Sequence, residues 1–96
     1  MKVDIQSLQH VFQSQGYSNE EGAFLLLRAQ LLKTVKEEIL RQELTQAEAA
    51  KKLGVKQPRI SEIFSLRIDK FSIELLIRYL YRLNKEVTFT IKNRSK

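Results

Sequence analysis

A chain of 96 residues, of which 43% are hydrophobic and 29% charged, is long enough for one domain and has the composition of a folded protein. It contains no cysteine, which excludes disulfide bonds and thiolate metal sites or nucleophiles. No apolar run approaches the roughly 20 residues that span a bilayer, so we expect a cytoplasmic protein without a membrane partner.

The positive charge is concentrated in the second half of the chain. Lys and Arg outnumber Asp and Glu by 17 to 11, which gives a formal net charge of +6. Residues 1–43 carry five basic and six acidic side chains, whereas residues 44–96 carry twelve basic and five acidic ones. Charge that served only solubility would be spread more evenly, so this distribution favours a surface that binds a polyanion such as nucleic acid.

The first strong helix signal begins at Ser18. Residues 1–17 are expected to form an N-terminal extension with a short turn or helix. Ser18 and Glu21 have the spacing of a capping box, which predicts a long helix that runs to about Gln42. The apolar face of this helix is wide enough to contact more than one neighbour, and we assign the residues that broaden it to a surface for a partner or a second copy: Phe24, Leu27 and Leu31.

Two short helices and a longer one follow. Thr45-Gln46-Ala47-Glu48 is a second capping box, and it predicts a two-turn helix that ends before Gly54. Pro58 is tolerated only in a first helical turn, so another helix must begin near Gln57. Ser72 is expected to cap a last helix that ends near Leu83.

A single β-strand is predicted near the end of the chain. Val87, Phe89 and Ile91 alternate with polar residues, which indicates a strand within residues 85–92. A lone strand needs a partner, and antiparallel pairing between two copies, which makes a homodimer, is favoured over pairing with Val3 and Ile5. The single domain therefore divides into residues 1–17, a helical core at 18–84, the strand at 85–92 and a basic tail at 93–96.

The two short helices have the spacing of a helix-turn-helix from Gln46 to Ser65. Ala50 is small where the two helices would cross, Gly54 suits the sharp turn, and Ile60 anchors the second helix on the core. In such a unit the second helix enters the major groove of DNA by its N-terminal end, and the start of the first helix meets the phosphate backbone.

The chain resembles a known family over about residues 16–91. The resemblance rests on Leu44-Thr45-Gln46-Ala47-Glu48-Ala49-Ala50, Leu53-Gly54-Val55 with Gln57-Pro58-Arg59-Ile60-Ser61, and Phe71-Ser72-Ile73-Glu74-Leu75-Leu76. These stretches resemble the Cro/repressor-type (XRE) family and its small HigA-like antitoxin branch. The resemblance implies a mainly α, five-helix-type Cro/repressor-like domain. It also implies a transcriptional regulator that represses its own operon as a dimer and neutralises a RelE-like ribonuclease toxin.

Two positions depart from the pattern of that family. Leu66 stands where the family usually has Gly after the second short helix, which leaves the geometry of the next loop open. Lys56 stands where Ser or Thr often caps that helix, so it removes a cap and adds a cation near the expected phosphate backbone.

Four side chains at the start of the second short helix are candidates for base contact. Gln57 has an amide that can bond an adenine edge, and Arg59 can bond guanine or fall back on phosphate. Ser61 and Glu62 lie one turn deeper, and for these two an ordinary solvated helix surface is an equally good interpretation. Four others are candidates for phosphate contact: Gln46, Lys56, Arg67 and Lys70.

Catalytic chemistry has little support. His10 is the only histidine and has no nearby nucleophile or acidic ligand cluster, and three glycines make no phosphate-binding loop, so we expect no enzyme activity, cofactor or metal. The leading hypothesis is a dimer that binds double-stranded DNA at an operator with two half-sites. The alternatives are a toxin-neutralising interaction module without significant specific DNA binding, and a non-specific, nucleoid-type DNA binder.

Overall fold

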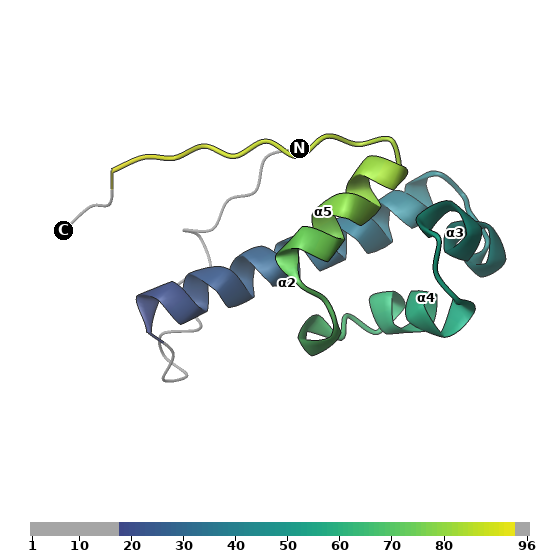
Figure 1. Ribbon diagram of the computed structural model, residues 1–96, viewed down its shortest axis with the longest axis horizontal. Coiled ribbons are helices and arrows are strands. Elements are labelled where there is room, and N and C mark those ends of the chain that lie inside the picture. Colours follow the sequence, from purple (N-terminus) through teal and green to yellow (C-terminus); the bar gives the residue numbers. More distant parts are fainter. Residues whose placement is uncertain (1–17, 94–96) are drawn as a thin grey trace.

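The computed structural model describes residues 18–93, which form four α-helices and one short 3₁₀-helix. In chain order these are α2 (Asn19–Arg41), α3 (Gln46–Leu53), α4 (Gln57–Phe64), η1 (Ile68–Lys70) and α5 (Ile73–Arg82). The long helix α2 runs through the molecule, α5 crosses it, and α3 and α4 lie near its C-terminal end (Figure 1). The predicted helix boundaries are confirmed, whereas the predicted first helix, the Val3–Ile5 segment and His10 lie outside the described residues.

The helix starts follow the predicted capping chemistry. The backbone N–H of Glu48 donates to the hydroxyl of Thr45 over 3.1 Å, and the Glu48 carboxylate accepts from the Thr45 N–H over 2.8 Å. Ser18 and Ser72 likewise accept a backbone hydrogen bond at the starts of α2 and α5. Lys56 precedes α4 and makes no side-chain cap, so this helix alone among the four begins without one.

Each of the four described α-helices is followed, within two residues of its end, by a residue with left-handed backbone. These residues are Glu43, Gly54, Leu66 and Asn84, with φ of 56°, 71°, 54° and 66°. The residue after each one donates its backbone N–H to the carbonyl five positions earlier, as Arg67 does to Glu62 over 3.1 Å. Leu66 therefore adopts the left-handed conformation that Gly would favour. Because Leu has a Cβ, its presence here in place of the usual Gly strains the backbone.

The core is built on the apolar face of α2. Leu31, Leu32, Val35 and Ile39 are fully buried there. The other helices add the remaining members of the buried cluster: Ala49, Ala50, Leu53, Ile60, Ile63, Phe71, Leu76, Tyr79, Leu80 and Leu83. The prediction that placed Leu31 on a partner surface is wrong, because Leu31 is fully buried in the core. Both α4 and α5 pack on α2, and its broad apolar face serves to contact these two helices.

The other residues assigned to a partner surface differ in exposure. Phe24 is 57% exposed, whereas Leu27 and Val87 are half-buried against the core. Phe89 and Ile91 are 50% and 95% exposed.

The predicted strand is absent from residues 18–93. Residues 85–93 run as an extended segment over the length of the molecule, and Thr88 takes part in one isolated β-bridge (Figure 1). A strand requires a continuous hydrogen-bonded ladder, and the described part of this chain provides none. The strand and its pairing across a dimer therefore stay predictions.

A buried carboxylate joins the end of α2 to the end of α5. Glu38 is 8% exposed and accepts hydrogen bonds from the Arg41 guanidinium and, over 3.2 Å, from the Gln42 amide. Lys85 Nζ lies 3.5 Å from the same carboxylate, and the Gln42 amide also donates to the Leu83 carbonyl over 2.7 Å. The hydrogen bond from Arg41 outweighs burial and, with Gln42 and the nearby charges, lowers the pKa of Glu38 from 4.5 to about 2.

Substitutions at Leu66 test the strain at the end of α4. We expect Leu66→Gly to be more stable than Leu66→Ala by about 0.5–1 kcal/mol, because only the alanine variant keeps a Cβ in the left-handed region. At the exposed mid-helix residue Glu37 the order should reverse, with the glycine variant less stable by about 1 kcal/mol. Urea unfolding of the four variants measures both differences, and the same order at both positions would contradict the strain.

The Glu38 cluster predicts a dependence of stability on pH. The folded-state pKa is depressed, so the stabilisation is complete above about pH 5 and is lost as the pH falls towards about 2. We expect Glu38→Gln to lower the free energy of unfolding by roughly 1–2 kcal/mol at pH 7, and the deficit to vanish near pH 2. Urea unfolding across this range measures it, with Glu37→Gln as the exposed control. A deficit that is constant with pH would contradict the role of the carboxylate.

Candidate nucleic-acid interface

The turn between α3 and α4 is tightly constrained. Gly54 ends α3 in the left-handed conformation, and a Cβ at this position would lie 3.4 Å from Nη1 of Arg82. That guanidinium donates a hydrogen bond to the Leu53 carbonyl and so caps the C-terminal end of α3 from α5. Ala50 is 5% exposed in the core cluster, consistent with the close helix crossing that the sequence predicts. The two short helices are therefore held in one arrangement.

α4 presents two polar side chains outward. Ile60 and Ile63 on its inner face are fully buried. Gln57 and Ser61 are exposed and lie four residues apart, which places them one above the other on the outer face. Their predicted exposure is confirmed, and their contact with DNA bases stays a prediction.

Arg59 and Glu62 are directed towards the protein. Arg59 Nη1 lies 3.2 Å from Glu62 Oε1, and its Nη2 donates to the Lys70 carbonyl over 3.0 Å. The centre of the guanidinium lies 4.3 Å from the ring centroid of Phe71. Burial disfavours the charge, but hydrogen bonds and charge interactions with Tyr79 and Glu62 outweigh it and raise the pKa of Arg59. The polar groups of Arg59 and Glu62 are thus used within the protein.

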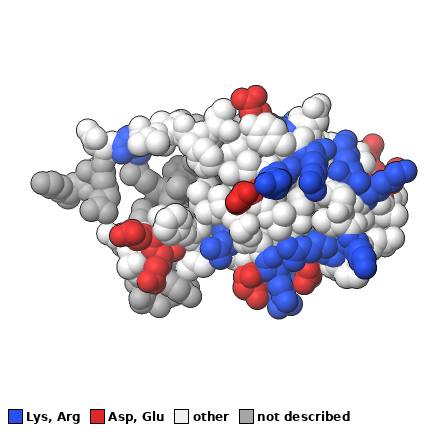
Figure 2. Space-filling model, in the orientation of Figure 1, with Lys and Arg blue, Asp and Glu red and all other residues white. Residues whose placement is uncertain are grey.

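The four predicted phosphate contacts surround α4 on the surface. Gln46 is exposed at the first position of α3, and Lys56 is exposed immediately before α4. Arg67 and Lys70 follow α4, with side chains 54% and 45% exposed. Figure 2 shows Lys and Arg side chains gathered over the part of the molecule that holds α3 and α4. The structure therefore brings cations to both ends of the outward face of α4.

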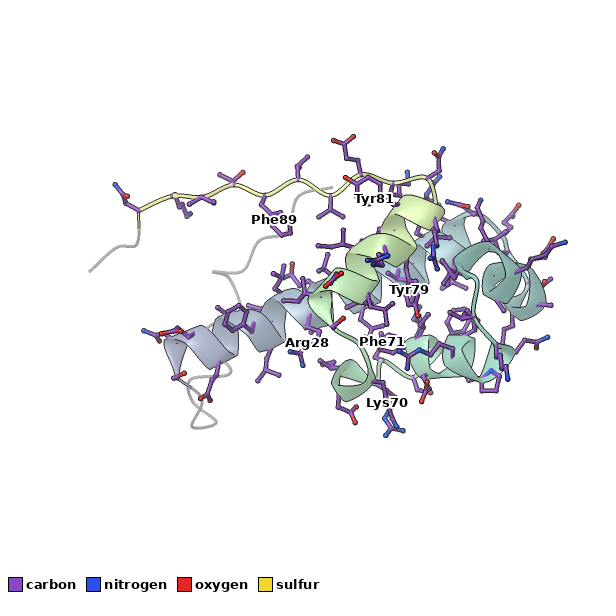
Figure 3. All side chains as sticks on the ribbon, viewed as in Figure 1. Arg28, Lys70, Phe71, Tyr79, Tyr81 and Phe89 are labelled. Carbon is purple, nitrogen blue, oxygen red and sulfur yellow. The ribbon has the colours of Figure 1, made fainter. Side chains whose placement is uncertain are left out.

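Two aromatic residues that the sequence interpretation did not assign to the site support Arg59. Phe71 and Tyr79 are 3% and 1% exposed, and their rings meet edge to face with centroids 6.2 Å apart. They lie between α5 and α4, with Lys70 at the outer edge (Figure 3). The signal available for Phe71 was its position at the start of a stretch that resembles the XRE family, and the signal for Tyr79 was its position off the main apolar stripe of the last helix.

Lys36 of α2 is a second contact that the sequence interpretation missed. Its Nζ donates to the Phe64 carbonyl over 3.0 Å and lies 5.7 Å from the centroid of the Phe64 ring, so it caps the C-terminal end of α4. The signal available was its spacing, because Lys36 lies one turn after the buried Leu32 and therefore borders the apolar face.

Two further features are absent from the described residues. Residues 18–93 contain no group of three or more His, Cys, Asp or Glu side chains that could hold a metal ion. None of the helices in this part of the chain is both long enough and apolar enough to cross a membrane.

Comparisons with known proteins agree with this geometry. Residues 11–92 match the family described as helix-turn-helix domain. The chain is similar to a solved structure named as an XRE family transcriptional regulator, with a TM-score of 0.69 and 30% sequence identity. The alignment covers 74% of this chain and 80% of that one. A search of curated proteins found no match.

Proposed function

The chain belongs to the helix-turn-helix domain family, and we propose that it is a sequence-specific DNA-binding transcriptional regulator. One observation carries the proposal: Gln57 and Ser61 are exposed one turn apart on α4, and exposed basic side chains stand at both ends of that helix. A short helix with this outer face fits the major groove, where side chains reach the edges of the bases.

The side chains divide between affinity and specificity. The Gln57 amide can donate to and accept from an adenine edge, and the Ser61 hydroxyl can serve as donor or acceptor. We assign Gln46, Lys56, Arg67 and Lys70 to phosphate contacts, which would supply affinity with little sequence information. Binding should therefore weaken steeply as the salt concentration rises.

We propose that the protein binds as a homodimer to an operator with two half-sites. The exposure of Phe89 and Ile91 supports this, because antiparallel pairing of residues 85–92 across a two-fold axis would cover these side chains. A two-fold symmetric protein reads an inverted repeat, with half-site centres about 34–36 Å apart.

Selection from random DNA duplexes tests the DNA-binding function. We expect an enriched inverted repeat, and we expect Gln57→Ala to relax the preference at one base pair per half-site at a cost of about 1–3 kcal/mol. Gln46→Ala makes the same chemical change at a proposed phosphate contact, so it should weaken binding to all sequences alike. Affinities are measured by titration at two salt concentrations.

The alternatives give different outcomes of the selection. Equal affinity for every duplex would instead indicate a non-specific, nucleoid-type binder. A chain with no significant affinity for DNA would leave only the interaction-module function.

A second candidate function is that of an autorepressing, HigA-like antitoxin that neutralises a RelE-like toxin. Phe24 supports it, because this aromatic side chain is 57% exposed near the start of α2. Glu20 and Glu21 lie in the adjacent first turn and would complement a basic ribonuclease. Leu27 is half-buried one turn along the helix and would form the base of the contact.

Co-expression with a basic RelE-like ribonuclease tests the antitoxin function. Wild-type chain should co-purify with the ribonuclease and restore growth, and Phe24→Asp should lose both effects but keep its affinity for DNA. Gln57→Ala is the matched control and should still neutralise the toxin. Full neutralisation by Phe24→Asp would contradict the assignment of this surface.

A further inference from the structure

α4 needs more than its apolar face to fix its orientation. The helix has only eight residues, and Ile60 and Ile63 are its two fully buried side chains. Phe64 packs partly buried against the core and Lys36 caps the C-terminal end of the helix, but the N-terminal end has no side-chain cap. A roll of the helix would redirect Gln57 and Ser61, and a further attachment beside the apolar face would oppose it.

We infer that Arg59 is a positioning residue that fixes the orientation of α4 against η1 and α5, and that it does not read a base. The inference rests on the proposed function of α4 as the DNA-reading helix. It replaces the base contact that the sequence suggested for Arg59.

The contacts of Arg59 cross from α4 to the following segment. Its guanidinium covers the ring of Phe71 at 4.3 Å and donates to the Lys70 carbonyl over 3.0 Å, while Glu62 anchors it on its own helix over 3.2 Å. The guanidinium stacks on the Phe71 ring with its face and donates hydrogen bonds from its edge at the same time. A lysine ammonium is not planar and cannot make both kinds of contact.

The surface beneath Arg59 is rigid. Phe71 and Tyr79 are almost fully buried and meet edge to face at an angle of 73°. Both belong to the core cluster that includes the buried residues of α2, so the ring that Arg59 covers cannot follow a rolling helix. Arg59 thus links the orientation of α4 to the core, and 29% of its side chain remains exposed.

Reading a base would cost the protein these contacts. To reach a guanine, Arg59 would have to leave the Phe71 ring, the Lys70 carbonyl and Glu62 together. Its departure would also take from the Glu62 carboxylate its closer cation, at 3.2 Å, and leave Lys70 Nζ at 4.0 Å. The loss of these contacts disfavours a base contact by Arg59. We therefore expect Gln57 and Ser61 to determine the sequence preference.

The full-length Arg59→Ala chain distinguishes positioning from base reading. We expect its Tm to fall by about 4–8 °C and its affinity to fall about tenfold for all sequences, with the selected motif and the salt dependence unchanged. Gln57→Ala provides the opposite pattern, a relaxed motif at unchanged Tm. Lys56→Ala is the phosphate control and should reduce the slope of log affinity against log salt by about one.

Three results with Arg59 variants would overturn the inference. They are a relaxed preference at any base pair, a reduced salt slope in Arg59→Ala, and recovery of both Tm and affinity in Arg59→Lys, which keeps the charge but not the fork.

A thermal double-mutant cycle of Arg59→Ala with Phe71→Leu needs no DNA. We expect the two Tm losses to be clearly less than additive, and additive losses would overturn the anchoring. If selection from random duplexes with the wild-type chain enriches no motif, the proposed function is wrong. The thermal cycle does not depend on DNA, so it still decides whether Arg59 anchors α4.

Discussion

The apolar face of α2 determines where α4 and α5 lie, and α3 packs in turn on α4 and α5. Leu31 and Leu32 are adjacent in sequence and both fully buried, so the face is wide enough to receive α5 on one side and α4 on the other. An isolated helix of eight residues has no stability of its own in water. α4 is therefore stable only because Ile60 and Ile63 are buried in the core that it shares with α2 and α3, and the same packing leaves Gln57 and Ser61 on the outside.

Long polar side chains then fix the helix ends, and each reaches from another helix. Lys36 of α2 caps α4, Arg82 of α5 caps α3, and Gln42 at the end of α2 binds the last turn of α5. Helix C-termini expose carbonyls and carry partial negative charge, so donors and cations are favoured there. Ordering these long side chains costs conformational entropy. The hydrogen bonds that they form offset this cost, and they fix the ends of neighbouring helices relative to one another.

Local features of this fold were predictable from sequence, and contacts between distant segments were not. Caps such as Thr45 and the break before Pro58 depend on residues within one turn, so the helix boundaries could be predicted. Periodicity showed that the face of α2 is broad but not that two helices cover it, and for this reason Leu31 was misassigned. The partner of Arg59 is Phe71, which is twelve positions away and meets it only through tertiary packing. The strand predicted within residues 85–92 is not shown in residues 18–93, because a strand needs a pairing partner that alternation along the sequence does not identify.

The assignment of Arg59 to positioning limits what one copy of α4 can discriminate. A good bidentate contact between a side chain and a base contributes about 1–3 kcal/mol of discrimination. Gln57 and Ser61 offer roughly one such contact and one weaker one, whereas specific regulators typically separate operator from other DNA by about 4–10 kcal/mol. Two half-sites bound together would approximately double this difference. The small number of reading side chains thus supports the proposed dimer, independently of the alternation in residues 85–92.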